Sequence, residues 1–122
     1  MIEIELPYPP SINHYYRRVG NRTLISREGR AYRVSVCAIL ADLGVRPLAG
    51  PLELWIEAFP PDRRRRDADN LLKSTLDALE HGGLYHDDGQ IKSLHVEMKC
   101  PVVGGRMLAR IQKWRRDHEI NQ

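Results

Sequence analysis

Four stretches of the chain have the pattern of β-strands: residues 2–6, 52–59, 91–98 and 106–114. In the first two, apolar residues recur at every second position, which is typical of a strand that buries one face. Prolines follow both of these strands, and proline cannot donate a hydrogen bond to a strand ladder. Residues 15–25 predict a further short hairpin that turns at Gly20-Asn21.

Two segments have the spacing of amphipathic helices. Ser26 is a suitable N-cap for a helix that runs to about Leu43, before Gly44 and Pro47. Its apolar stripe consists of Tyr32, Val36, Ile39, Leu40 and Leu43. The second helix begins between Asp67 and Asp69 and ends at Gly82-Gly83. Its expected apolar stripe consists of Ala68, Leu72, Leu76 and Leu79.

These elements together predict an α+β fold, a single compact domain with a mixed or antiparallel sheet and two helices packed on it. A length of 122 residues fits one domain, so we assign residues 1–122 to it, with a basic tail from about residue 114. No stretch approaches 18 consecutive apolar residues, which argues against a membrane partner. The acidic start, residues 1–5, differs from a secretory signal, and Cys37 and Cys100 form no metal or redox motif. We therefore expect a cytoplasmic protein.

The positive charge is mostly arginine and is clustered. The chain has 15 arginines against four lysines, and its net charge is +3. Six arginines lie between Asn13 and Arg33 beside a single acid, and Arg63–Arg66 is an unbroken run. Such clusters are typical of a nucleic-acid interface. The alternative is that they are two solvent-exposed charged faces that bind no nucleic acid. The candidate nucleic-acid contacts are Asn13, Tyr15, Tyr16, Arg17, Arg18, Arg22, Arg63, Arg64, Arg65 and Arg66. The two tyrosines either stack on unpaired bases or pack the hairpin.

The arginine run leads directly into two carboxylates spaced i and i+2, Asp67 and Asp69. In an extended or turning backbone such residues point the same way and can bind one cation. Their hard oxygen ligands suit Mg²⁺ or Mn²⁺, although one aspartate can instead be a helix N-cap. Lys73 lies at i+4 from Asp69, where it either forms a surface ion pair or directs its charge at a reacting phosphate.

A second carboxylate pair, Asp87-Asp88, follows the second helix at the mouth of the next strand. One of the two can complete a three-carboxylate site. The alternative is a polar turn, which the Asp88-Gly89 pair also favours. Spacing alone leaves both interpretations open.

Three blocks of the sequence resemble the RusA-type endodeoxyribonucleases, the small Holliday junction resolvases of bacteria and their phages. The blocks are Pro7–Arg17, Pro61–Lys73 and Gly83–Asp88, and the resemblance extends from Leu6 to about Ile111. It implies a homodimer that nicks four-way junction DNA symmetrically during recombination and repair, with Mg²⁺ as cofactor and Mn²⁺ as a substitute. The essential aspartates of that family fall on Asp67, Asp69 and Asp88, and its essential lysine falls on Lys73. The chain departs from the family pattern at Ile12 and in its basic tail.

The sequence thus predicts phosphodiester hydrolysis by a metal-activated water, with one or two Mg²⁺ on Asp67, Asp69 and Asp88 and with Lys73 stabilising negative charge. One alternative is a non-catalytic, basic nucleic-acid-binding module, and another is a metal-dependent nuclease of other branched DNA or RNA. A binding module explains the arginines but not the five aspartates around them, so these acids favour an enzyme. They are Asp62, Asp67, Asp69, Asp87 and Asp88. Two symmetric nicks require two copies of one site, hence a dimer. The apolar stripe of residues 32–43 either forms its interface or packs on the sheet.

Overall fold

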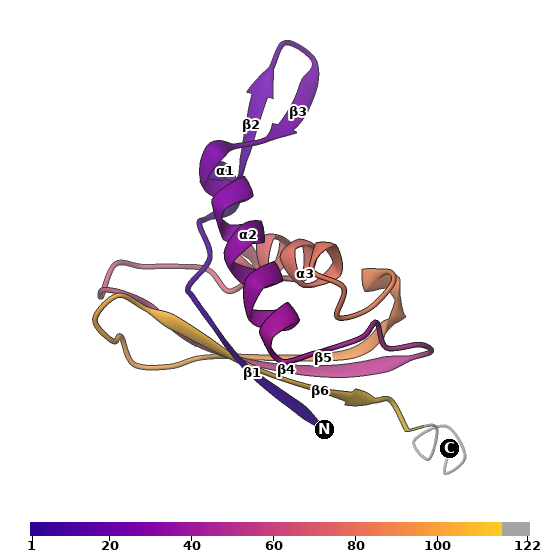
Figure 1. Cartoon of the computed structure of the whole chain (residues 1–122). Coiled ribbons are helices and arrows are strands. Elements are labelled where there is room, and N and C mark those ends of the chain that lie inside the picture. The colour runs from indigo at the N-terminus through magenta and orange to yellow at the C-terminus, as the bar shows by residue number, and fades with distance from the viewer. Residues whose placement is uncertain (116–122) are drawn as a thin grey trace.

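A mixed four-stranded sheet forms the base of the molecule (Figure 1). The computed structural model describes residues 1–115. The order of the strands across the sheet is β1 (Ile2–Leu6), β6 (Arg106–Lys113), β4 (Leu52–Phe59) and β5 (Ile91–Met98). Strand β6 pairs antiparallel with both of its neighbours, whereas β5 runs parallel to β4. The predicted α+β class and the mixed sheet are confirmed.

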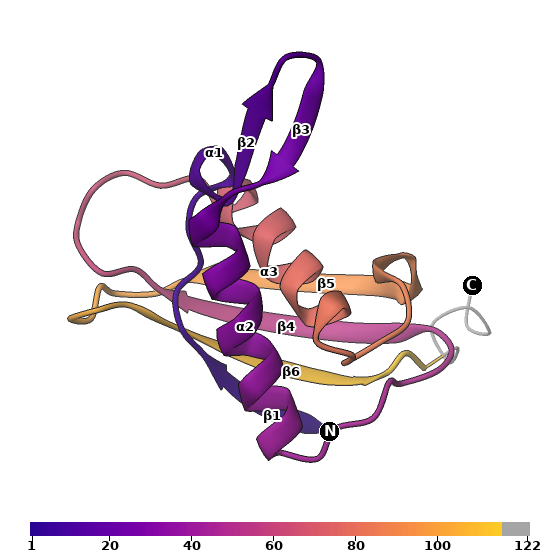
Figure 2. The same ribbon diagram turned by 45° about the horizontal axis from the view of Figure 1, so that its top comes forward.

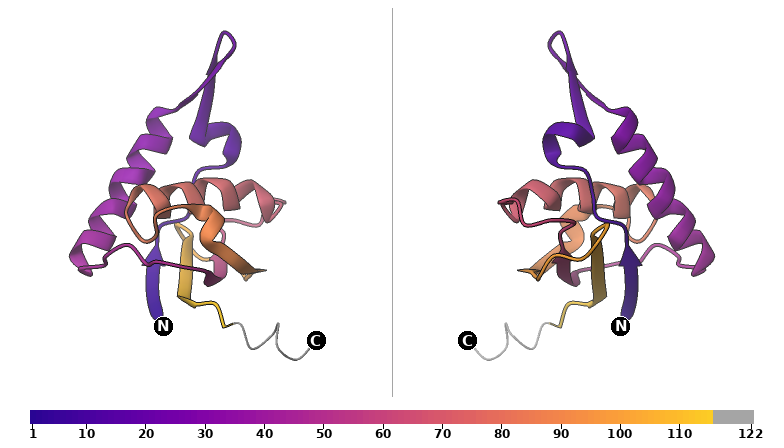
Figure 3. Two further views of the ribbon diagram at one scale, coloured as in Figure 1. Left: turned by 90° about the vertical axis from the view of Figure 1, so that its right-hand side faces the viewer. Right: turned by 90° about the vertical axis from the view of Figure 1, so that its left-hand side faces the viewer.

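Two long helices lie over one face of this sheet (Figures 1 and 2). They are α2 (Arg27–Asp42) and α3 (Asp69–His81), and a one-turn helix, α1 (Ile12–Tyr15), adds to the two that the sequence predicts. In the described part of the chain the opposite face of the sheet carries no helix (Figure 3). None of the helices within residues 1–115 has the length and apolar character needed to cross a membrane.

Helix α2 forms as its sequence predicts. The Ser26 side chain accepts a hydrogen bond from the Gly29 backbone N–H at 2.9 Å, which caps the first turn. Tyr32, Val36 and Leu40 are buried in the core of the same chain. Of the two roles considered for this stripe, these side chains therefore pack within the chain and do not form a dimer interface. Leu43 departs from the prediction: it lies at the C-cap and is 53% exposed.

The predicted apolar stripe of α3 is partly wrong. The helix buries Leu71, Ser74, Thr75, Ala78 and Leu79, whereas two of the predicted residues, Leu72 and Leu76, are only half-buried. The buried face includes two hydroxyl residues because their hydroxyls donate to the Leu71 carbonyl, at 3.1 Å from Ser74 and 2.8 Å from Thr75. Satisfied in this way, small polar side chains cost little to bury.

The predicted hairpin is confirmed, and it projects away from the rest of the molecule (Figures 1–3). It consists of β2 (Tyr16–Val19) and β3 (Arg22–Ile25), joined at Gly20-Asn21. Gly20 has a positive φ of 62°, which the tight turn requires. Tyr15 was expected in the hairpin but lies in α1, with its side chain fully buried.

Candidate active site

The loop of residues 61–67, here called the arginine loop, is organised by Asp62. Its carboxylate accepts from the Arg64 backbone N–H at 2.9 Å and forms an ion pair with Arg66 at 2.7 Å. These contacts hold the pKa of Asp62 well below its usual range. Arg66 also donates to the carbonyls of residues 62 and 64, both at 3.1 Å.

The four arginines of the loop therefore differ in what they can offer to DNA. The Arg66 guanidinium is held by the loop itself and lies 5.8 Å from the centre of the Tyr8 ring. Arg64 is exposed but shares the Asp62 carboxylate. Arg63 and Arg65 are exposed and form no ion pair with any residue from 1 to 115. They have the most freedom to contact phosphates.

The arginine loop ends at Asp67, and α3 begins two residues later at Asp69; the carboxylates of both residues are exposed. Neither carboxylate forms a hydrogen bond or an ion pair within residues 1–115, although four arginines precede them. Neither therefore caps α3. Of the two backbone forms considered for this pair, the turning one is observed, because Ala68 between them lies in a turn with helical dihedrals (φ −58°, ψ −37°). Their role as metal ligands stays a prediction.

Asp88 lies in a different acidic group, formed with Glu80 and Asp87 and here called the acidic trio. One carboxylate oxygen of each lies within 4.8 Å of the others. The Asp88 backbone N–H donates to Glu80 at 2.7 Å, and the turn continues through the 3-10 helix η1 (Asp88–Gln90) into β5. Asp88 thus stands at the mouth of the next strand, as predicted. Sequence reasoning missed Glu80, and its place in the last turn of the predicted helix, two residues before Gly82, was the available signal.

The structure does not bring Asp67 and Asp69 together with Asp88 in one chain. Asp69 is in the first turn of α3 and Glu80, which contacts Asp88, is in the last. Eleven residues of helix separate them, a rise of about 16 Å. In Figure 2 the arginine loop and the turn before β5 accordingly lie at opposite ends of α3. Within residues 1–115, the acidic trio is the group of three carboxylates close enough to share a cation.

Lys73 lies one turn along α3 from Asp69, and it faces the hairpin. Its ammonium is 5.1 Å from the centre of the Tyr16 ring, a cation–π contact. No ion pair joins Lys73 to Asp69 in the described part of the chain, so the simple surface pair is not what forms. Burial, followed by the Asp77 charge, raises the pKa of Tyr16.

The base of the hairpin is fixed to the helices by a polar cluster. Tyr15 donates its hydroxyl hydrogen to Asp77, and Arg33 forms an ion pair with the same carboxylate at 2.7 Å. Burial, then the hydrogen bond to Asp77, raises the pKa of Tyr15. Because the Tyr15 ring has no exposed surface, the prediction that it stacks on DNA bases is wrong.

The remaining predicted nucleic-acid contacts are exposed: Asn13, Arg17, Arg18 and Arg22. The hairpin register places Tyr16 opposite Ile25 and Arg17 opposite Leu24. Side chains alternate between the faces of a strand, so Arg18 shares a face with Tyr16, whereas Arg17 lies on the other face.

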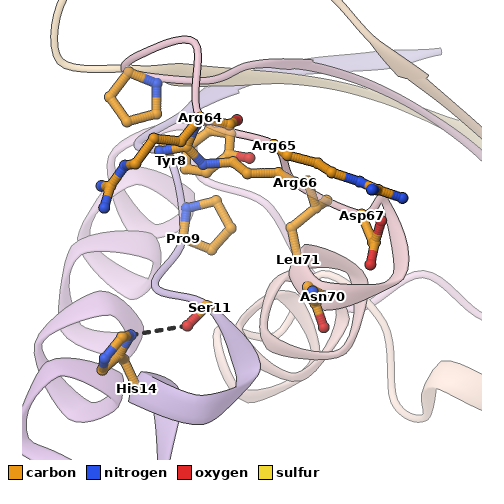
Figure 4. A pocket seen from close by; sticks show the side chains of 11 residues that line it. Tyr8, Pro9, Ser11, His14, Arg64, Arg65, Arg66, Asp67, Asn70 and Leu71 are labelled. Atoms are coloured by element: carbon orange, nitrogen blue, oxygen red, sulfur yellow. Dashed lines mark hydrogen bonds between the residues drawn. The ribbon is translucent and has the colours of Figure 1, made fainter.

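A pocket of about 360 Å³ lies beside Asp67, between the segment of residues 8–14 and the arginine loop (Figure 4). Its apolar lining includes Tyr8, Pro9 and Leu71. Its polar and charged lining consists of Ser11, His14, Arg64, Arg65, Arg66, Asp67 and Asn70.

Comparison with known proteins identifies relatives over most of the chain. The family model described as endodeoxyribonuclease RusA matches residues 7–112. A protein of Enterobacteria phage 82 named crossover junction endodeoxyribonuclease rusA is 49% identical over 109 residues, covering 85% of this chain and 88% of the relative. The proteins of the same name from Escherichia coli K12 and Shigella sonnei Ss046 are 48% and 49% identical, with the same coverage. The chain belongs to the RusA family of endodeoxyribonucleases.

Proposed function

We propose that this protein is a crossover junction endodeoxyribonuclease that resolves Holliday junctions by paired, symmetric nicks. The observation that carries the proposal is that the carboxylates of Asp67, at the end of the arginine loop, and of Asp69, at the start of α3, form no ion pair within residues 1–115. A surface meant only to bind phosphates gains nothing from free carboxylates there, because they repel the backbone. A divalent cation between carboxylate and phosphate removes that conflict. The related proteins that are named for this activity support the proposal.

The residues fit Mg²⁺, with Mn²⁺ as a substitute. Asp67, Asp69 and Asp88 offer only carboxylate oxygens, the ligand type that these hard cations prefer. The close carboxylates of the acidic trio repel one another, and a cation relieves this repulsion. When bound, the ion supplies Lewis-acid chemistry, neutralising charge on the scissile phosphate and acidifying water.

The length of α3 favours a site shared between two chains. One chain keeps Asp67 and Asp69 at one end of the helix and Asp88 at the other. In a two-fold dimer with antiparallel α3 helices, each end of one helix approaches the opposite end of its partner. The proposed homodimer then holds two equivalent sites, each with Asp67 and Asp69 from one chain and Asp88 from the other. Two such sites match the two-fold symmetry of a four-way junction.

The other residues bind and orient the DNA. Arg63 and Arg65 contact phosphates on one side of Asp67, and the hairpin arginines extend the basic surface outward. Lys73 stabilises negative charge as the phosphodiester bond breaks, from the helix face that also carries Asp69. Tyr16 holds the Lys73 side chain beneath the hairpin.

The test is a labelled four-way junction incubated with each of three variants, Asp67→Asn, Asp69→Asn and Asp88→Asn. Each removes a negative ligand, so cutting in Mg²⁺ should fall by about 100-fold or more, while junction binding persists or tightens. Asp42→Asn, an exposed aspartate at the end of α2, is the matched control and should cut normally. Near-normal cutting by any of the three would remove that residue from the ligand set.

The same assay separates the alternatives. A junction that is shifted on a gel but never cut, with or without Mg²⁺, would identify a binding module. Equal or faster cutting of DNA flaps or RNA hairpins would identify a nuclease of another substrate. Cutting of the junction alone, abolished by removing the metal with EDTA, is the expected result.

A further inference from the structure

The pocket beside Asp67 has the build of a binding site for a single flat ring. Tyr8, Pro9 and Leu71 form an apolar lining, and Arg65 stands at the edge near Asp67 (Figure 4). A volume of about 360 Å³ is near the lower end of small-molecule sites, about 300–1,000 Å³. It therefore suits one nucleotide rather than a duplex.

The walls of the pocket are held in place by the rest of the fold. The buried Tyr32 hydroxyl donates to the Pro7 carbonyl at 2.9 Å, and Ser74 donates to the Pro10 carbonyl at 3.2 Å. Behind Tyr8, a Cβ added at Gly105 would lie only 2.9 Å from the Tyr8 Cβ. Together with the Asp62 contacts in the arginine loop, these interactions preorganise the pocket before any ligand enters.

Hydrogen-bonding groups remain free inside this rigid frame. Ser11 Oγ and His14 Nδ1 share a hydrogen bond at 2.9 Å, which leaves the other ring nitrogen of His14 open (Figure 4). The Asn70 side-chain amide forms no hydrogen bond within residues 1–115. An amide presents a donor and an acceptor side by side, the pattern found along the edge of a base.

We propose that this pocket binds one unstacked DNA base of the strand that is cut. The proposal rests on the endonuclease function proposed above. The three arginines that line the pocket, Arg64, Arg65 and Arg66, attract a phosphate, but a phosphate alone leaves the apolar lining unused and is repelled by Asp67. A base stacks on that lining and hydrogen-bonds to Asn70 and His14, and its own phosphate reaches the Arg65 guanidinium. Unstacking costs least where pairing is already interrupted, as at the exchange point of a junction.

The experiment uses a set of four-way junctions that differ only in the position of a single abasic nucleotide near the exchange point. Binding is measured in EDTA, so the result does not depend on metal or cutting. The wild-type protein should lose roughly tenfold in affinity when one particular position lacks its base, and little elsewhere. The double variant His14→Ala/Asn70→Ala should bind the intact junction more weakly and should be insensitive to base removal at that position. His95→Ala, on the uncovered face of the sheet, should behave as the wild type.

Two outcomes would overturn the proposal. If no abasic position weakens wild-type binding, the pocket holds a phosphate or nothing. If one position matters equally to the wild type and to the double variant, the base is bound elsewhere. Failure of the endonuclease proposal has a different signature, because it would leave all junctions uncut in Mg²⁺ whatever the binding pattern in EDTA.

Discussion

Among single side chains, Asp62 orders the arginine loop of the predicted DNA surface, although it is itself an acid. It spaces Arg64 and Arg66 by accepting from both, and Arg66 in turn covers one side of Tyr8. The loop would otherwise consist of four adjacent like charges that repel one another. Asp62 therefore lowers the net positive charge of the loop and at the same time fixes the positions of the Arg64 and Arg66 side chains.

Replacing Asp62 with asparagine tests whether geometry or net charge matters more. Asp62→Asn makes the surface more positive, which by itself should tighten DNA binding. We expect instead a several-fold weaker junction affinity, because the arginines lose the partner that orders them. Fluorescence anisotropy at fixed salt measures this directly. Glu5→Gln, which removes an equal charge from the uncovered sheet face, is the control, and tighter binding by Asp62→Asn would mean that net charge dominates.

At the scale of elements, the contact between the hairpin and α3 joins DNA binding to the predicted catalytic lysine. Tyr16 begins β2 and its ring lies beside the Lys73 ammonium. Tyr15, which directly precedes Tyr16, is bound to Asp77 of α3 together with Arg33, and these contacts hold the base of the hairpin against the helix. A hairpin that is displaced from α3 would leave Lys73 without its support.

Tyr16→Ala should therefore slow cutting by about tenfold under single-turnover conditions, with little change in junction affinity. Tyr16→Phe keeps the aromatic face and should restore most of the rate. In a Lys73→Ala background, Tyr16→Ala should have no further effect, because the two residues act through one interaction. Additive losses would show that Tyr16 acts on its own, for example by stacking on DNA.

The two faces of the hairpin should contribute unequally to phosphate binding. Arg18 shares a face with Tyr16, along which DNA must run to reach Lys73, whereas Arg17 lies on the opposite face. Arg18→Ala should reduce the slope of log affinity against log salt by about 1, and Arg17→Ala should reduce it less. Equal effects would place DNA against both faces, and no effect of either would place the hairpin away from DNA.

The sequence predicts elements better than their arrangement. Alternation, proline and capping residues locate β1, β4 and α2 because these signals act over a few neighbouring residues. The burial of Tyr15 depends on Asp77, which lies 62 residues away, and so has no local signal. The candidate site shows the same limit: its residue types are visible in the sequence, but the separation of Asp69 from Asp88 follows from the length of α3.

Over the whole molecule, charge is divided between the two sides of the sheet. The uncovered face carries the glutamates that alternate with buried residues on the strands: Glu3, Glu5, Glu53 and Glu57. The nearby cations are paired with them, Arg106 with Glu5 at 3.3 Å and Arg110 with Glu57 at 3.5 Å. This face offers little to a phosphate backbone, so DNA is expected on the side of the helices and the hairpin.

That arrangement, together with the length of α3, allows a decisive test of the shared site. Homodimers of Asp69→Asn and of Asp88→Asn should both be inactive. If each site combines Asp67 and Asp69 from one chain with Asp88 from the other, a mixed dimer carries both substitutions in one site and none in the second. Mixing the two inactive variants should therefore restore nicking of one strand. When subunits exchange at random between equal amounts of the two variants, up to half of the dimers are mixed. If each site lay within one chain, both sites of the mixed dimer would be damaged and nothing would be cut. Differently tagged chains, purified through both tags and assayed on a junction with a label on each strand, distinguish the two outcomes.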